Sequence, residues 1–348
     1  ILEKDASYLN RFINIFSMKY AEKMEVYSFT DQDAAKKAIE TNRIDVFIVS
    51  DLFEVNVEEL PKRCSFAYFV DSSNVESFND QRAICKFQKI DLIYKQILSL
   101  YAEKANNISD FKVGDDTTRV IAFTSPSGGA GCSTLAAACA LHYASYEKKV
   151  LYLNLERYGS ADRFFVGEGR FDMSDVIFAI KSKKANLALK LESCVKVDNR
   201  GVHFFSETKN AMDMLEIEAE ECAQLISELK ISGTYEYIIL DVDFMVGKDM
   251  LSLYRKADRL ILVGDGSDIS NGKIVRAYQV LSMLERNMEI PLVSKACLIY
   301  NKFSSKTSSV LEGIELKNIA GVSKIEHATT QQLIGHIAEN EMFDRIFE

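Results

Sequence analysis

The sequence predicts an α/β protein made of two three-layer domains, each a largely parallel sheet covered by helices. Three observations support this prediction. The length of 348 residues suits two domains. Short apolar runs alternate with amphipathic helical patterns along the chain. One polar segment, Glu103–Thr118, interrupts this alternation. We therefore expect a first domain over residues 1–104, a linker over 105–117 and a second domain over 118–348.

In the first domain, three short apolar runs are predicted as buried strands: DVFIV (Asp45–Val49), FAYFV (Phe66–Val70) and AICKF (Ala83–Phe87). Helical patterns cover Asp33–Glu40 and Ile90–Leu100. Strands alternating with helices are typical of a parallel sheet.

The second domain has longer apolar runs, as expected for strands that are covered on both faces. Helical patterns such as Ser133–Tyr146 and Lys273–Arg286 lie between them. The predicted strands are Val120–Thr124, Val150–Leu155, Tyr237–Asp241, Arg259–Val263 and Ala296–Asn301.

Composition narrows the range of functions. The formal net charge of −9 argues against nonspecific nucleic-acid binding, which needs a basic excess. Seven cysteines without a C-x-x-C pair suggest reduced thiols in a cytoplasmic protein. No apolar run approaches the ~20 residues that span a bilayer. The four histidines have no metal-binding spacing, and the acidic run Glu216–Glu221 is predicted to be a solvated helix face.

A glycine-rich segment, SPSGGAGCST (Ser125–Thr134), joins a predicted strand to a predicted helix. Such a turn directs backbone N–H groups towards one point at the positive end of the helix, and this geometry binds phosphate. Ser133 lies where a hydroxyl would contact Mg²⁺. A dinucleotide site is an alternative, because Gly129 and Gly131 form GxG and Glu156 follows at a strand end, but the third glycine is replaced by Thr134.

Ser127–Thr134 (SGGAGCST) resembles the deviant Walker A loop, KGGxGK[ST], of the MinD/ParA ATPases. Both lysines are replaced, the signature lysine by Ser127 and the phosphate-binding lysine by Cys132. The resemblance implies catalytic-site positions at Asn154, Glu156 and Asp241, with Mg²⁺ held by Ser133 and Asp241. It implies ATP-binding positions at Ser127, Gly128, Gly129, Ala130, Gly131, Cys132, Ser133, Thr134 and, for the adenine, Asn301.

Loss of the lysines should affect hydrolysis more than binding, because these lysines stabilise charge that grows in the transition state. We therefore expect ATP and Mg²⁺ to bind, with weak ATPase activity at most. Asn154 cannot accept a proton as an aspartate could. Faster turnover would need a lysine from elsewhere, and Lys302 and Lys306 are candidates. Cys132 is predicted to fill space rather than to act as a nucleophile.

The N-terminal residues resemble the receiver domains of response regulators. The strand DVFIVSD places Ser50 in the phosphoacceptor position, with Asp51 one residue later. Lys86 matches the receiver lysine, and Glu3 and Asp5 lie near the acidic positions. Because consecutive strand residues face opposite ways, Asp51 does not replace the acceptor. We expect a receiver-like, flavodoxin-like fold without phosphotransfer.

An atypical receiver-like domain followed by a MinD/ParA-like domain without its lysines resembles the TadZ/CpaE family of pilus assembly proteins. The resemblance implies a homodimer, recruitment of the pilus secretion machinery, and localisation at a cell pole for Flp (Tad) pilus assembly. ATP would then act as a structural ligand. An active ParA/MinD-like ATPase in intracellular positioning is the alternative. The last residues, ENEMFDRIFE, form no basic amphipathic helix, so direct membrane attachment is not expected.

Overall fold

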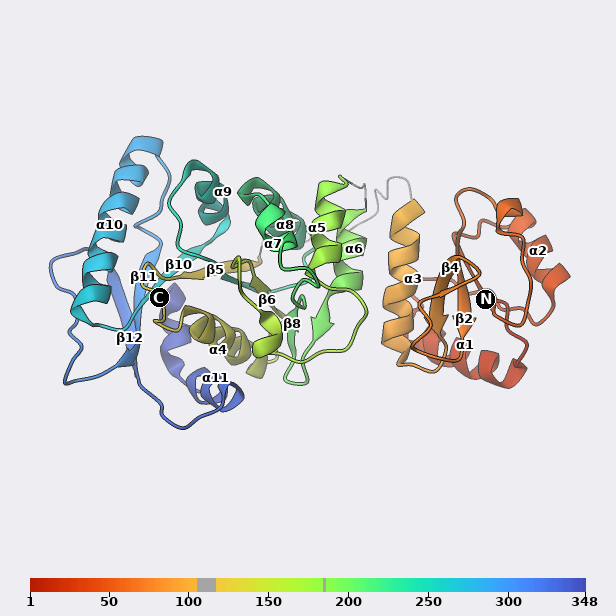
Figure 1. Cartoon of the computed structure of the whole chain (residues 1–348), viewed down its shortest axis with the longest axis horizontal. Helices are drawn as coiled ribbons and strands as arrows, with labels where there is room; N and C mark the ends of the chain where they lie inside the picture. Colours follow the sequence, from red (N-terminus) through yellow and green to blue (C-terminus); the bar gives the residue numbers. More distant parts are fainter. Residues whose placement is uncertain (105–116, 184–185) are drawn as a thin grey trace. The chain divides into compact units, whose positions relative to one another are not determined.

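The computed structural model describes residues 1–104, 117–183 and 186–348, apart from the side chains of residues 248–250 (Figure 1). The described residues form two compact units, one from residues 1–104 with 183 and 186–193, and one from residues 117–182 with 194–348. The predicted linker, residues 105–117, lies almost wholly outside the described residues, so its boundaries stay a prediction. Residues 186–193 group with the first unit rather than with the rest of residues 118–348.

The first unit is built on a parallel sheet whose strands are β1 (Val46–Ser50), β2 (Ser65–Val70) and β4 (Gln81–Cys85), with the short antiparallel β3 (Ser77–Phe78) at its edge. Leu2 forms parallel bridges to both Phe29 and Val49, so it lies in the position of one more strand. Counted along the chain, the segments at Leu2 and Phe29 are numbers 1 and 2, and β1, β2 and β4 are numbers 3, 4 and 5. Their order across the sheet is therefore 2-1-3-4-5, the order of flavodoxin-like folds.

Helices cover both faces of this sheet. Helices α1 (Ala6–Tyr20) and α3 (Ile90–Lys104) enclose one apolar core, which includes Phe16 and Phe69. Helix α2 (Gln32–Thr41) encloses another through Ala35 and Ile39. The remaining elements are the 3-10 turn η1 (Val57–Glu59) and helix α6 (Leu187–Cys194), whose Leu189 joins the core of α1 and α3.

The second unit contains an eight-stranded sheet of order β12-β11-β10-β5-β9-β6-β8-β7. Neighbouring strands are parallel except for β7 and β8. All five predicted strands are present in its centre. The strands are β5 (Arg119–Thr124), β6 (Val150–Asn154), β7 (Lys196–Val197), β8 (Val202–Phe204), β9 (Tyr237–Asp241), β10 (Arg259–Gly264), β11 (Ala296–Phe303) and β12 (Lys317–Ser323).

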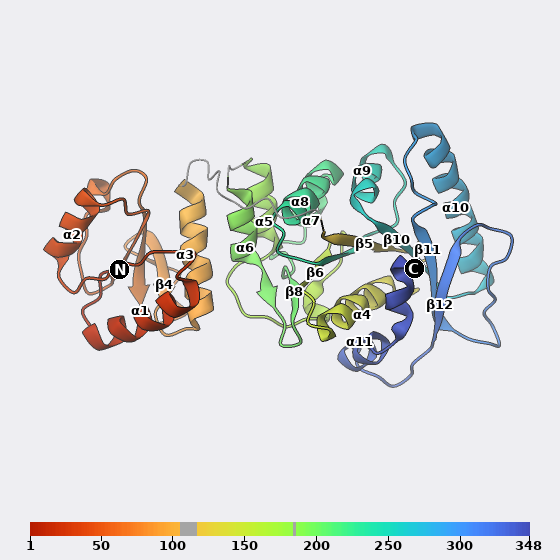
Figure 2. The same ribbon diagram turned by 180° about the vertical axis from the view of Figure 1, so that it is seen from behind.

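Helices α4 and α11 lie on one side of this sheet and α8 and α9 on the other (Figures 1 and 2). The main core lies between the sheet and α4, α11 and η3. The helices are α4 (Cys132–Ser145), α5 (Met173–Lys181), α7 (Asp213–Glu216), α8 (Ala219–Ile231), α9 (Lys248–Lys256), α10 (Asp268–Met288) and α11 (Thr330–Ala338), with 3-10 turns η2 (Ala161–Arg163) and η3 (Glu341–Phe347). The prediction of two three-layer α/β domains is confirmed.

One predicted element is wrong. The acidic run Glu216–Glu221 is not a single helix face, because α7 ends at Glu216 and α8 begins at Ala219. Glu218 and Glu221 instead form a capping box, in which each carboxylate satisfies backbone N–H groups at the start of α8.

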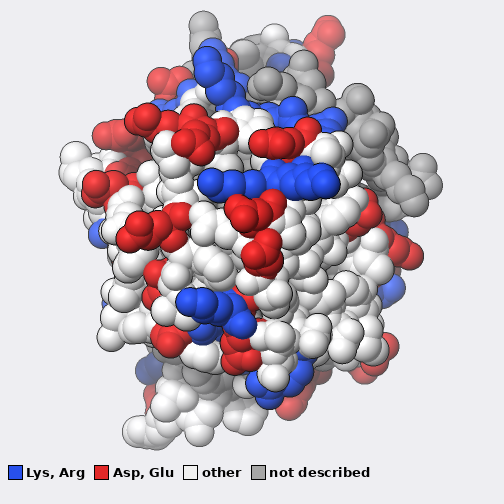
Figure 3. Space-filling view, turned by 90° about the vertical axis from the view of Figure 1, so that its right-hand side faces the viewer, with Lys and Arg blue, Asp and Glu red and all other residues white. Residues whose placement is uncertain are grey.

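Two further features of the described residues are the distribution of surface charge and the length of the helices. Acidic and basic side chains are interspersed on the face shown in Figure 3. Among the helices of the described residues, none is both long and apolar enough to cross a membrane.

Candidate functional site: a glycine loop facing buried carboxylates

The predicted phosphate loop connects β5 to α4 at the carboxyl edge of the sheet. Gly129 and Gly131 have φ values of 79° and 83°, a region that strongly favours glycine. A Cβ atom on Gly131 would lie 2.3 Å from Nδ2 of Asn301. Gly131 is the N-cap of α4 and offers no side chain to the first-turn N–H groups. These groups are therefore available to a bound anion.

Ser125 and Ser127 hold the start of the loop. The Ser125 hydroxyl lies within donating distance of the carbonyls of Ser127 (2.8 Å) and Val263 (2.6 Å), and it accepts a hydrogen bond from the N–H of Ser127 (3.1 Å). Ser127, at the position of the family's signature lysine, is 7% exposed. Its short, buried side chain cannot reach outwards as that lysine does.

Strands β9 and β6 bring a carboxylate and its hydrogen-bond donors to the same edge. Asp241 is fully buried at the end of β9, and its Oδ2 accepts hydrogen bonds from Tyr152 (2.7 Å) and from Nδ2 of Asn154 (3.0 Å). Among the described residues, Oδ1 of Asp241 is one of a few buried polar atoms without a hydrogen-bond partner. An unsatisfied buried carboxylate oxygen is suited to binding a cation.

Burial, and then the charge of Glu156, raise the pKa of Asp241 to about 8. Glu156 follows β6 and accepts a hydrogen bond from the Ser133 hydroxyl (3.0 Å). The structure thus brings Ser133, Glu156 and Asp241 together, although they come from three separate segments.

Asn154 has a different role from that of a catalytic acid or base. Its Nδ2 donates to Asp241, while its Oδ1 accepts from the N–H of Glu156 (3.2 Å). It therefore orients Asp241, and the structure gives it no proton-transfer role. Tyr152 was not predicted as a site residue. The available signal was its place two residues before Asn154 on one strand, which puts both side chains on the same face.

Cys132 begins helix α4 and is half-buried. Burial, followed by the charges of Asp241, Glu156 and Asp243, raises the pKa of its thiol well above the usual value. A nucleophilic cysteine needs the opposite shift. Its properties agree with a space-filling role.

Asn301 and Lys302, at the end of β11, both reach the loop. Nδ2 of Asn301 donates to the carbonyls of Ala130 (2.9 Å) and Gly131 (3.4 Å). Nζ of Lys302 donates to the carbonyl of Gly129 (2.7 Å). The amide of Asn301 therefore fastens the loop to β11, and its contact with adenine stays a prediction. Lys306 is exposed, and its backbone N–H donates to the Ser304 hydroxyl (3.4 Å).

The residues present fit Mg²⁺ as part of a nucleotide complex. Among the described residues, no group of three or more His, Cys, Asp or Glu side chains could hold a metal by itself. Mg²⁺ is usually held by one or two carboxylates together with substrate phosphates. The free Oδ1 of Asp241 and the Ser133 hydroxyl match that donor set.

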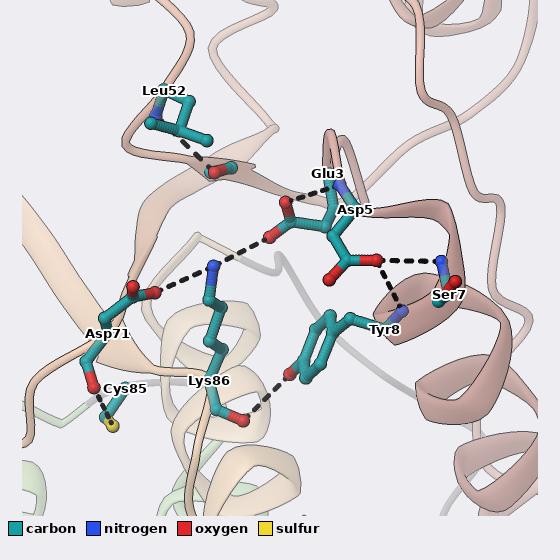
Figure 4. A network of polar contacts seen from close by, with 9 residues as sticks. Glu3, Asp5, Ser7, Tyr8, Leu52, Asp71, Cys85 and Lys86 are labelled. Atoms are coloured by element: carbon teal, nitrogen blue, oxygen red, sulfur yellow. Dashed lines mark hydrogen bonds and ion pairs between the residues drawn. The ribbon is translucent and has the colours of Figure 1, made fainter.

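The first unit has its own polar cluster where a receiver has its active site (Figure 4). The Lys86 ammonium lies between Asp71 (2.7 Å) and the fully buried carboxylate of Glu3 (3.5 Å). Burial alone would lower the pKa of Lys86, but its bonds to Asp71 and Glu3 outweigh this and raise it. The lysine therefore serves as the counterion of a buried carboxylate.

The residues at the other receiver-like positions also make hydrogen bonds within the fold. Asp5 caps helix α1 by accepting from the N–H groups of Ser7 and Tyr8 (Figure 4). Ser50, at the end of β1, is fully buried, and its hydroxyl accepts from the N–H of Leu52 (3.5 Å). The half-buried Asp51 follows it and donates its N–H to Phe69. The acceptor position thus carries a buried hydroxyl instead of a carboxylate.

Comparisons with known proteins agree with both folds. Residues 1–102 match the family model described as "TadZ-like, receiver domain". No curated protein matches the chain significantly. A ParA family ATPase from Chlorobium tepidum TLS is 20% identical, with a TM-score of 0.52 over 67% of this chain and 97% of that chain. The septum site-determining protein MinD of Pyrococcus horikoshii OT3, solved with Mg-ADP, is 16% identical, with a TM-score of 0.50 over 64% and 95%.

At these identities the two solved structures establish the fold of the second domain. The match to the family model identifies residues 1–102 as a receiver-like domain independently, from the sequence. Residues 1–102 are thus similar to TadZ-like receiver domains, and the second domain has the fold of the ParA and MinD structures.

Proposed function

We propose that the second domain binds ATP with Mg²⁺ as a structural ligand, and that hydrolysis is slow or absent. The observation that carries this proposal is the loop itself. Its glycines and uncapped helix start remain, whereas the positions of both family lysines hold the buried Ser127 and the half-buried Cys132. Backbone N–H groups suffice for ground-state phosphate binding, but rapid transfer needs added positive charge.

Each part of the site has a defined task in this proposal. The N–H groups at the start of α4 bind the phosphates, and Asn301 holds the loop against β11. Ser133 and Asp241 hold Mg²⁺, which when bound offsets the negative charge of the phosphates. Tyr152 and Asn154 orient Asp241 through their hydrogen bonds to its Oδ2. Among these groups Glu156 is the remaining candidate base, and its Oε2 already accepts from Ser133.

Calorimetric titration with Mg-ATP, with sizing chromatography and phosphate release on the same sample, tests this proposal. We expect saturable binding, a shift towards a larger species and negligible turnover. The Gly131→Ala variant is the negative control, because a Cβ there would collide with Asn301. No binding by the wild-type chain would contradict the proposal.

We further propose that the ATP-bound state recruits the secretion machinery of Flp (Tad) pili at a cell pole, with the receiver-like domain as an interaction module. The similarity of the first domain to TadZ-like receiver domains supports this role. The buried Ser50 lies at the phosphoacceptor position and Lys86 is paired with the buried Glu3, so we expect this domain to bind partners rather than to accept phosphate. A fluorescent fusion should form a polar focus that Gly131→Ala abolishes. Acetyl phosphate with Mg²⁺ should leave the mass of the protein unchanged. Diffuse wild-type fluorescence or phosphorylation would contradict these two expectations.

An active ParA/MinD-like ATPase is the second candidate, and the position of Lys302 at the loop is the observation in its favour. Steady phosphate release that falls when Lys302 is replaced would support this candidate over a structural role for ATP.

A further inference from the structure

The end of strand β11 has an irregular backbone beside the loop. Pairing with β12 is Tyr300 to Gly321 and then Phe303 to Ser323, so Asn301 and Lys302 face the single residue Val322. Two residues opposite one define a β-bulge, a feature that redirects side chains near functional sites. Lys302 has φ 56°, in the left-handed region that is costly for a residue with a Cβ.

This bulge accounts for an unusual pair of contacts. Consecutive residues of a regular strand point to opposite faces. Here Asn301 and Lys302 both reach the loop, the first at the carbonyls of Ala130 and Gly131 and the second at that of Gly129. A Cβ placed on Gly131 would also lie 3.6 Å from Cε of Lys302, so the lysine stem runs beside the loop as well.

The surroundings of the loop are negatively charged. Asp241, Glu156 and Asp243 are all close enough to raise the pKa of the Cys132 thiol by their charges. Both lysine positions of the loop carry uncharged residues, Ser127 and Cys132. Phosphates brought to this loop would meet carboxylates without a lysine from the loop itself.

We propose that Lys302, delivered by the bulge, is the phosphate-contacting cation of this site and replaces the lysines that the loop lacks. The inference rests on the proposed ATP binding. On binding, the Lys302 ammonium exchanges its hydrogen bond to the neutral Gly129 carbonyl for an ionic hydrogen bond to a phosphate oxygen. The left-handed backbone at Lys302 is costly for lysine but not for glycine, and this phosphate contact gives the strained position a function.

The test is equilibrium binding of ATP, ADP and AMP with Mg²⁺, measured by calorimetry on the full chain. Lys302→Gln should weaken ATP binding about tenfold, the low end for a charge-assisted hydrogen bond, because the side chain is exposed. AMP binding should change less than twofold, and the dependence of ATP affinity on salt should become shallower. Lys302→Arg should keep most of the affinity. Lys306→Gln, on the same segment, is the matched control and should bind as wild type.

Lys302→Gly separates charge from folding. It relieves the left-handed strain, so its melting temperature should equal or exceed that of the wild type while ATP binding falls as in Lys302→Gln. Equal ATP affinity in wild type and Lys302→Gln would overturn the inference. An equal loss for AMP and ATP would also overturn it and assign Lys302 a loop-fastening role. If the wild-type chain binds no ATP, the proposed function itself fails.

Discussion

Replacing Asp241 by Asn should make the free energy of unfolding less sensitive to a rise in pH from about 4 to about 8. Asp241 is fully buried, and burial together with the charge of Glu156 raises its pKa from 3.8 to about 8. Asparagine keeps the shape of the side chain and an oxygen that can accept from Tyr152 and Asn154. The substitution therefore removes the titration while preserving the packing.

The sign follows from proton binding in the two states. Below about pH 4 the carboxyl is protonated whether the chain is folded or not. Between about pH 4 and about pH 8 the unfolded chain loses this proton while the folded chain keeps it, so stability is lost as pH rises through this interval. The full difference is on the order of 5 kcal/mol, at about 1.4 kcal/mol for each tenfold change in proton affinity. Since Glu156 supplies part of the shift, we expect a measured effect of about 3 kcal/mol.

The assay is urea unfolding with EDTA present, followed by far-ultraviolet circular dichroism because the chain has no tryptophan. Measurements below and above this pH interval give the loss of unfolding free energy for each protein. The loss should be smaller in Asp241→Asn than in wild type by about 3 kcal/mol. Equal losses would refute the reasoning, because Asp241 would then titrate alike in both states. Saturating Mg-ATP in place of EDTA should reduce the wild-type loss more than that of Asp241→Asn.

Two other substitutions test the loop and the first domain. Gly131→Ala should destabilise the fold by about 1–2 kcal/mol and abolish detectable ATP binding, because its backbone is left-handed and its Cβ would meet Asn301 at 2.3 Å. Gly128→Ala is the matched control, with nothing within 4 Å of its Cβ, and normal binding by both variants would contradict this. Lys86→Met should leave the buried Glu3 carboxylate unpaired and destabilise the first domain by about 3–5 kcal/mol, seen as faster hydrogen exchange there. The double variant with Glu3→Gln should recover part of this loss, and unchanged exchange in Lys86→Met would disprove the pairing.

Local patterns in the sequence were enough to predict the two-domain α/β architecture. Continuous apolar runs such as Tyr237–Asp241 can be stable only inside a sheet covered on both faces, and that strand appears with the predicted bounds. The glycine loop could also be predicted, because its chemistry lies in one continuous segment. Helix α1 was not predicted, since its burial depends on packing against a sheet formed far along the chain.

Only the tertiary structure decided how residues far apart in the sequence act together. Tyr152 and Asn154 hold Asp241 across almost ninety positions, and Lys86 pairs with Glu3 across 83. The sequence offered both Lys302 and Lys306 as candidate cations, and the contact that distinguishes them arises from a bulge in the pairing of β11 with β12. Strand propensity is local, whereas the register between two strands depends on both partners and on what packs beside them. For this reason the sequence revealed which charges the loop lacks, and the fold determined which lysine lies beside it.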